Sequence, residues 1–267
     1  MNISGYSSNL YGWEERYKAD GRDSSLDAIL RDCAKAGLDA VEVAPRHDAV
    51  ALTRAYGLRI AAMYVGLPLH EPFESLRIDE TVITPARRFS EAGGTDLLLN
   101  ANPKGEWANP QQKTEEELKR QGDNMTRIAR FMSPLGLKVC MHNHAAAYTK
   151  AEGDLRSVID YADPIVGLCV DTGWAHTAGH DPLEWMLRYP DRITALHLRN
   201  QFGSTPAEDL LEGDIDMSRL IGTLQKIGYS GWIGMELWHP PKTNPQRSML
   251  EDVQRSVQYL KNLVHSL

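Results

Sequence analysis

Short apolar runs alternate along the chain with longer stretches in which apolar residues recur every three to four positions. This alternation predicts strands that are each followed by an amphipathic helix. One helix is predicted over residues 25–36, where the apolar residues share a face: Leu26, Ile29, Leu30, Cys33 and Ala34. Ser24 is placed to cap this helix, and Gly37 can take the left-handed conformation that ends it.

Eight such units are predicted, with strands over residues 2–4, 40–43, 59–65, 96–100, 137–141, 165–170, 193–198 and 232–235. Further helices are predicted over residues 47–56, 79–91, 153–161 and 182–188, after a capping box of Thr114 and Glu117, from Asp216 to Gly228, and at the carboxyl end. Apolar strands that alternate with helices indicate a parallel sheet covered on both faces. Eight units favour a single (β/α)8 TIM barrel, an α/β fold over residues 1–267, rather than an open doubly wound sheet.

Composition and charge exclude several other classes of protein. The formal net charge of −7 lacks the basic excess of a nucleic-acid binder. Three scattered cysteines provide no disulfide framework, so a reducing cytosol fits best. No apolar run reaches about 18 residues, and the first residues lack the pattern of a secretory signal. We therefore expect a cytoplasmic protein that binds neither nucleic acid nor membrane.

Polar residues follow the last four predicted strands, where the active sites of barrels form. The chain places His142, Asp171, His197 and Glu236 at these four ends. Two imidazoles and two carboxylates make a suitable ligand set for one divalent ion. We expect this ion to be the cofactor, with manganese as the first choice and magnesium, cobalt, zinc or iron as alternatives.

Other side chains near the strand ends are candidates for catalysis or substrate binding. His144 and Glu236 are candidate bases for removing a proton next to a carbonyl, and either His142 or His144 could be the ligand on the fifth strand. The candidate substrate-binding residues are Arg199, Trp238, Trp174, Glu42 and His70. Each of these also admits a structural role, such as an ion pair for Arg199 or a core aromatic for Trp174. The two strand cysteines, Cys140 and Cys169, are expected to be small core residues.

The ordered motifs at these strand ends resemble those of the sugar phosphate isomerase/epimerase family of xylose isomerase-like barrels. The matching stretches are residues 141–144, 170–174, 196–199 and 234–238, together with residues 211–216, which are similar to the family's turn before the seventh helix. The resemblance implies metal ligation by the same four residues. Two positions depart from the family pattern, because His142 stands where isomerases have a glutamate, and Trp174 stands where many sugar epimerases have a histidine.

These departures change the reaction that the resemblance implies. Epimerases of the family use glutamates on the fifth and eighth strands as a base and acid pair, and here only Glu236 remains. We therefore favour a lyase that acts on a keto-sugar by β-elimination or hydration, in a site to which Ala145–Ala147 leave space. The pattern His142-Asn143-His144 resembles that of family members that are lyases and hydratases of 3-keto-glycosides, and this resemblance implies the same substrate class here. The alternatives are a metal-dependent sugar isomerase or epimerase, and a non-catalytic sugar-binding or partner subunit. The expected partner is a small sugar, and the sequence leaves a homo-oligomer open.

Overall fold

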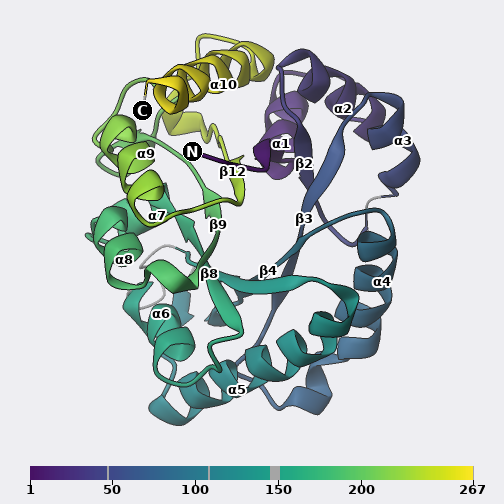
Figure 1. Ribbon diagram of the computed structural model, residues 1–267, viewed down its shortest axis with the longest axis vertical. Coiled ribbons are helices and arrows are strands. Elements are labelled where there is room, and N and C mark those ends of the chain that lie inside the picture. The colour runs from purple at the N-terminus through teal and green to yellow at the C-terminus, as the bar shows by residue number, and fades with distance from the viewer. Residues whose placement is uncertain (47, 108, 145–150, 267) are drawn as a thin grey trace.

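Eight parallel strands form the wall of a barrel in the computed structural model, which describes residues 1–46, 48–107, 109–144 and 151–266 (Figure 1). The strands are β1 (Gly5–Asn9), β2 (Ala40–Val43), β3 (Arg59–Leu67), β4 (Asp96–Ala101), β7 (Lys138–His142), β8 (Val166–Asp171), β9 (Ile193–His197) and β12 (Trp232–Met235). They are ordered β12-β1-β2-β3-β4-β7-β8-β9. Leu198 closes the ring, because its N–H donates to the Gly234 carbonyl (2.8 Å) and its carbonyl accepts from the Glu236 N–H (3.1 Å). The predicted TIM barrel is confirmed.

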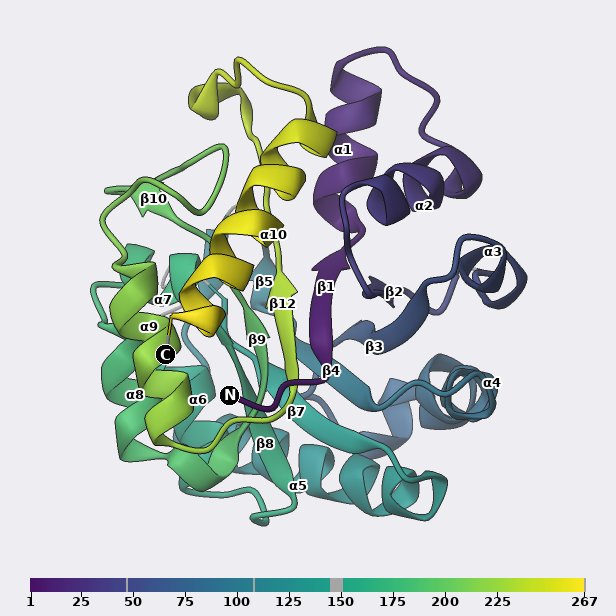
Figure 2. The same ribbon diagram turned by 45° about the horizontal axis from the view of Figure 1, so that its top comes forward.

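Helices cover the outside of this wall (Figures 1 and 2). They are α1 (Tyr11–Ala19), α2 (Leu26–Lys35), α3 (Val50–Ala55), α4 (Thr84–Glu91), α5 (Glu115–Met132), α6 (Ala151–Ile159), α7 (Thr172–Thr177), α8 (Pro182–Arg188), α9 (Met217–Lys226) and α10 (Met249–His265). Short hairpins follow two of the strands: β5 (Lys104–Glu106) with β6 (Asn109–Gln111), and β10 (Gln201–Phe202) with β11 (Thr205–Pro206). Single turns of 3-10 or π helix occur at Phe73–Leu76, Asp79–Ile83, Ser133–Leu135, Pro190–Arg192 and Pro241–Thr243. None of the helices in the described part of the chain is both long and apolar enough to cross a membrane.

The predicted boundaries agree closely with the structure in the later units and less closely at the start. Strands β2 and β12 and helix α8 have the predicted bounds, and the capping box of Thr114 and Glu117 is present. The first strand was predicted at residues 2–4 but lies at Gly5–Asn9, where buried serines replace the expected apolar residues. One of them, Ser8, accepts a hydrogen bond from Trp13 Nε1 (3.1 Å), which removes the cost of burying its hydroxyl.

Other differences concern helix ends and polar elements. Ser25, not Ser24, caps α2, because its hydroxyl accepts from the Ala28 N–H (3.3 Å). Helix α1 and both hairpins were not predicted. The predicted start of the helix at residue 47 and the run Ala145–Ala147 lie outside the described residues.

Alternation along the strands divides the core into two layers. Inside the barrel, mostly small apolar side chains form one buried cluster: Ala62, Leu98, Cys140, Cys169 and Ala195. Their sequence neighbours, such as Val139 and Met141, point outward into a much larger cluster that joins the strands to the helices. Both strand cysteines are therefore buried core residues, as predicted.

Helix α1 lies directly against the chain that leaves β12. A Cβ atom on Gly12 would be only 1.8 Å from the Leu237 carbonyl oxygen, so this approach requires a glycine. Figure 2 shows α10 on the outside of the barrel, with one end near α1 and the other near α9. The first and last segments of the chain thus support each other beside Glu236.

Asp96, at the amino end of β4, is a buried carboxylate far from the strand ends that carry the predicted site. Burial raises its pKa from 3.8 to about 6, although the Thr95 hydroxyl donates to Oδ2 (3.0 Å). The folded state therefore holds this proton more tightly than the unfolded state does. As a consequence, ionisation of Asp96 lowers the free energy of unfolding as the pH rises from about 4 to about 6.

We predict that Asp96→Asn removes this loss. The variant should match the wild type at pH 3.5 and exceed it by about 2 to 3 kcal/mol in free energy of unfolding at pH 8. Urea unfolding at several pH values measures the difference, with the exposed Asp191→Asn as control. A difference that does not change with pH would contradict the prediction.

Candidate active site

Four side chains from consecutive strands converge at the carboxyl end of the barrel. His142 ends β7, Asp171 ends β8, His197 ends β9 and Glu236 follows β12, and each offers one ligand atom within 4.8 Å of the others. His142 Nε2 lies 3.5 Å from both Asp171 Oδ2 and Glu236 Oε2. His197 Nδ1 lies 2.7 Å from Glu236 Oε2. The structure thus brings together all four residues that the sequence predicts as ligands.

The converging atoms are buried, and within the described residues their close polar contacts are the ion pairs that they form with one another. They are His142 Nε2, Asp171 Oδ2, His197 Nδ1 and Glu236 Oε2. On His197 and Asp171 the second polar atom of the side chain is occupied: His197 Nε2 lies 2.7 Å from Glu42 Oε2, and Asp171 Oδ1 has three donors. Asp171 Oδ1 accepts from the Trp174 N–H (2.7 Å) and from Arg199 Nε (3.1 Å) and Nη2 (2.8 Å). Because orphaned buried polar atoms are rare and costly, a set that faces one point fits a bound cation.

The charged side chains of this cluster strongly shift one another's pKa values. Burial lowers the pKa of His197, but the carboxylates of Glu42 and Glu236 outweigh it and hold that pKa well above its usual value. Burial raises the pKa of Glu236, but His197 and His142 outweigh it and hold that pKa well below its usual range. The two carboxylates therefore attract positive charge to this point, as protons or as a metal ion.

Asn143 fixes the distance between two of the strand ends. Its side-chain Oδ1 accepts from the Asp171 N–H (2.7 Å), and its Nδ2 donates to the Asp171 carbonyl (3.0 Å). The amide thus continues the pairing of β7 and β8 by one further residue. This role was not predicted, although a buried amide between two histidines is the signal that could have indicated it.

His144 lies beside the cluster rather than in it. Its ring stacks on Trp174 (4.7 Å between centroids, 26° between planes) and meets Trp107 edge-on (5.4 Å). Burial, aided by the charge of His142, lowers the pKa of His144 to about 3. Its ring is therefore a neutral imidazole at neutral pH. Between the two ligand candidates on the fifth strand, the geometry places His142, not His144, among the converging side chains.

A cavity of about 650 Å³ opens at the strand ends and reaches the cluster at Glu236. Six of the predicted residues line it: Glu42, His144, Trp174, Arg199, Glu236 and Trp238. Arg199 also lies 4.3 Å above the Trp174 ring while it binds Asp171, so it supports both the cluster and the wall. Trp238 lies 5.9 Å from Trp174 and extends this aromatic surface.

His70 does not line the cavity, in contrast to its predicted position. The chain turns outward after β3, and Asn124 Nδ2 on α5 donates to the Leu69 and Glu71 carbonyls (both 2.9 Å). His70 Nε2 lies 3.6 Å from Glu71 Oε1, and burial lowers the pKa of His70. A prediction from strand order alone could not include this outward turn.

Several residues of the cavity were missed. Tyr64 points into the barrel, with its ring 5.4 Å from that of His142 and stacked 6.3 Å from that of His197. Its alternation with Ala62 along β3 could have indicated this orientation. Tyr11 and Trp107 lie at the rim and are about half exposed (48% and 51%), on α1 and beside the β5–β6 hairpin, which were not predicted.

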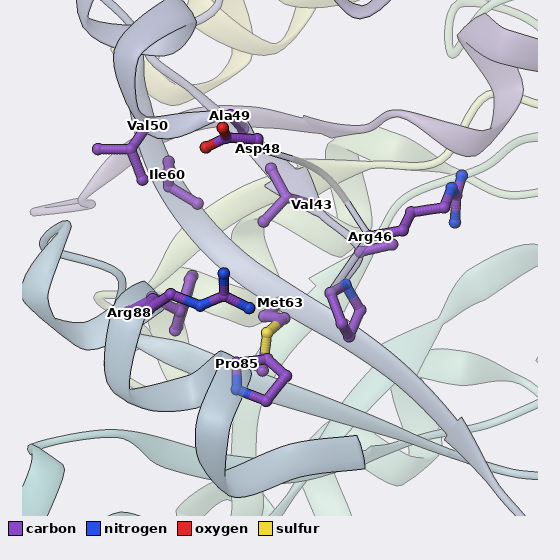
Figure 3. Close-up of a pocket in the computed structure, with 12 residues that line it drawn as sticks. Val43, Arg46, Asp48, Ala49, Val50, Ile60, Met63, Pro85 and Arg88 are labelled. Carbon is purple, nitrogen blue, oxygen red and sulfur yellow. The ribbon is translucent and has the colours of Figure 1, made fainter. Parts of the chain in front are cut away.

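A second cavity, of about 270 Å³, lies outside the barrel wall between β2, β3, α3 and α4 (Figure 3). Its charged residues do not converge: the Arg46 guanidinium extends away from Met63 and Arg88 and binds Glu14 instead (2.7 Å). The cavity at the strand ends is therefore the stronger candidate for chemistry.

The family assignment follows from comparison with known proteins. A model of the xylose isomerase-like TIM barrel family matches residues 30–263. The chain belongs to this family. An inosose dehydratase of Geobacillus kaustophilus is 24% identical over 280 residues, which cover 92% of this chain and 90% of the relative.

Two solved structures of related proteins share this fold. A sugar phosphate isomerase/epimerase from Parabacteroides distasonis has a TM-score of 0.76 and 20% identity, over 97% of this chain and 94% of that one. The IOLI protein, solved with a zinc atom, has a TM-score of 0.71 and 17% identity over 98% of both chains. The predicted resemblance is confirmed, as is the prediction of an enzyme of the lyase or isomerase/epimerase kind.

We predict that Asn143→Ala lowers the free energy of unfolding by about 2 to 4 kcal/mol, because it leaves both backbone groups of Asp171 buried without their partner. Urea unfolding measures this loss, and the exposed Asn109→Ala serves as control. A loss no larger than that of the control would show that Asn143 does not hold the strand ends together.

Proposed function

We propose that this protein is a divalent-metal-dependent lyase that acts on a keto-sugar, in particular a 3-keto-glycoside, by β-elimination or hydration. The observation that carries the proposal is the convergence of four buried ligand atoms beside one neutral imidazole, that of His144, next to a cavity that Glu236 and His144 line. His142, Asp171, His197 and Glu236 would hold the ion. Manganese stays the expected metal, and a cytoplasmic location stays a prediction.

A divalent ion at this point would polarise a carbonyl oxygen of the sugar and offset the negative charge that develops on it. His144 is the proposed base, since it lines the cavity with its ring unprotonated at neutral pH, although its low pKa makes it a weaker base than a free imidazole. Trp174 and Trp107 hold that ring from one face and from one edge. Glu236 is the alternative base, although its Oε2 already faces the cluster.

The proposed elimination removes one proton and one leaving group from neighbouring carbons of the sugar. His144 takes the proton from the carbon next to the ketone, and the electron pair of that C–H bond forms a C=C bond. The bond from the anomeric carbon to the leaving oxygen breaks, and the leaving group departs with its electron pair and then acquires a proton. The product is an unsaturated ketone, to which water can add. In this scheme one base acts on one face of the sugar.

Epimerisation is less well supported, because it needs a second group on the opposite face to return the proton. The family's glutamate for that task is replaced by His142, which lies within the cluster, and Trp174 occupies the position of a frequent epimerase histidine. The dehydratase named among the relatives eliminates rather than epimerises. A metal-dependent isomerase or epimerase stays the second candidate, and a non-catalytic sugar-binding subunit the third.

The cavity also favours a substrate larger than a free ketose. Its volume of about 650 Å³ lies within the range of pockets that bind ligands of drug size. Aromatic side chains line its wall and rim: Tyr11, Trp107, Trp174 and Trp238. Such a surface suits a sugar that carries an apolar group at the anomeric carbon.

We predict that the enzyme loaded with manganese releases the aglycone from 3-keto-glucosides. NMR of the reaction in D2O, with free ketohexoses as the parallel substrate, measures the products. Deuterium incorporation without aglycone release would instead establish isomerase or epimerase activity. Binding of the ion and of both sugars without any turnover would support the non-catalytic role.

We predict that His144→Gln lowers kcat by about 10²- to 10⁴-fold, the usual contribution of a positioned base, while metal affinity is retained. The exposed His265→Gln is the control, because it lies on α10 away from the cavity. Unchanged kcat in His144→Gln would exclude this residue as the base and leave Glu236 as the candidate.

A further inference from the structure

Glu42 is a buried carboxylate whose two oxygens have separate partners. It lies on β2, three strands away from β9 around the barrel, yet Oε2 is 2.7 Å from His197 Nε2. Oε1 accepts from Asn9 Nδ2 at 2.6 Å. Glu42 thus connects the first strands of the barrel to one of the four converging side chains. Nothing in the proposed reaction so far assigns it a task.

The orientation of these hydrogen bonds is fixed at one end by the backbone. The Tyr11 N–H can only donate, and it donates to Asn9 Oδ1 (2.6 Å). The other end of the Asn9 side chain must therefore be its NH2 group, which donates to Glu42 Oε1. A carboxylate only accepts, so the remaining oxygen of Glu42 requires a proton on His197 Nε2.

This series of hydrogen bonds determines which nitrogen of His197 presents a lone pair. With one proton held at Nε2 by Glu42, an ion would displace only the proton that Nδ1 shares with Glu236 Oε2 (2.7 Å), and the neutral ring would then present its lone pair at Nδ1, the atom that faces the cluster. We propose that Glu42 is a positioning residue that fixes the orientation and tautomer of His197 for binding the ion. The inference rests on the proposed metal-dependent function and deepens it.

An amide side chain could not replace Glu42 in this role. Asn9 Nδ2 and His197 Nε2 are both donors, and a glutamine side chain has only one acceptor oxygen for them. If that oxygen faces Asn9, the glutamine NH2 faces His197 and favours the tautomer with its proton on Nδ1. The hydrogen would then occupy the direction in which the ion must bind.

The test compares Glu42→Gln with a double variant that restores the pattern. In Asn9→Asp/Glu42→Gln, the introduced carboxylate would accept from both the Tyr11 N–H and the glutamine NH2, which turns the glutamine oxygen toward His197. The exposed Glu91→Gln, on α4, is the matched control. The measurement is the Kd of the metal-free protein for Zn²⁺ and Mn²⁺, by competition with a chromogenic chelator, with circular dichroism to monitor folding.

Glu42→Gln should weaken metal binding about 10- to 100-fold, the usual effect of removing an outer partner of a ligating histidine. The double variant should recover most of that loss, which a merely structural role of Glu42 would not predict. If Glu42→Gln fails to fold, the affinity of the double variant decides: near the wild-type value it supports the inference, and a loss of about a hundredfold overturns it.

Two failures can be distinguished. If the wild type binds the ion and Glu42→Gln binds it equally well, the role of Glu42 is overturned and the proposed function stands. A folded double variant that binds as weakly as folded Glu42→Gln also overturns it. If the wild type binds neither ion, the metal-dependent function itself is overturned, and the inference with it.

Discussion

The pair of hydrogen bonds that Leu198 makes with β12 is the constraint on which the candidate site depends. These bonds join the last strand of the ring to β9, and they place Glu236 next to His197 across the junction. Without this closure, the two residues would lie at opposite edges of an open sheet, because β9 and β12 are the ends of the continuous strand order. Barrel closure and assembly of the cluster are therefore one event. Gly12 supports the same junction from outside, since only a glycine allows α1 to approach the Leu237 carbonyl.

The hydrogen bonds around the cluster select which atoms stay available. Asp171 shows this most clearly: three donors occupy Oδ1, and Oδ2 alone faces its neighbours. Two of those donors belong to Arg199, for which the sequence left open a substrate contact and an ion pair, and the structure shows the ion pair. Arg199, at the mouth of the barrel, thus acts by occupying one oxygen of the Asp171 carboxylate. The hydrogen bonds of the site thus form a network that occupies one polar atom of a side chain and leaves a lone pair on the other available.

The fold and the four converging residues could be predicted because their signals are local. An apolar run followed by a polar residue marks a strand end, and barrel topology then places the ends together. The misplaced first strand and the omitted α1 have a common cause, which is that Ser8, Asn9 and Trp13 satisfy one another only after folding. His70 was misplaced because Asn124, more than fifty residues later in the chain, holds that turn against α5. A contact between distant segments decides the position of His70, whereas the first strand and α1 depend on polar side chains that no apolar pattern marks.

Glu42 and the four proposed ligands lie in different halves of the chain, and this separation couples the two halves. All four proposed ligand side chains follow β4 in the sequence, whereas Asn9 and Glu42 precede it. A carboxyl-terminal fragment would possess every donor atom for an ion but would lack the group that orients one of them. Binding of the ion and docking of the two halves should then reinforce each other, as linked equilibria must. In such a fold, the affinity for an ion held only by the second half would depend on whether the first half is folded in place.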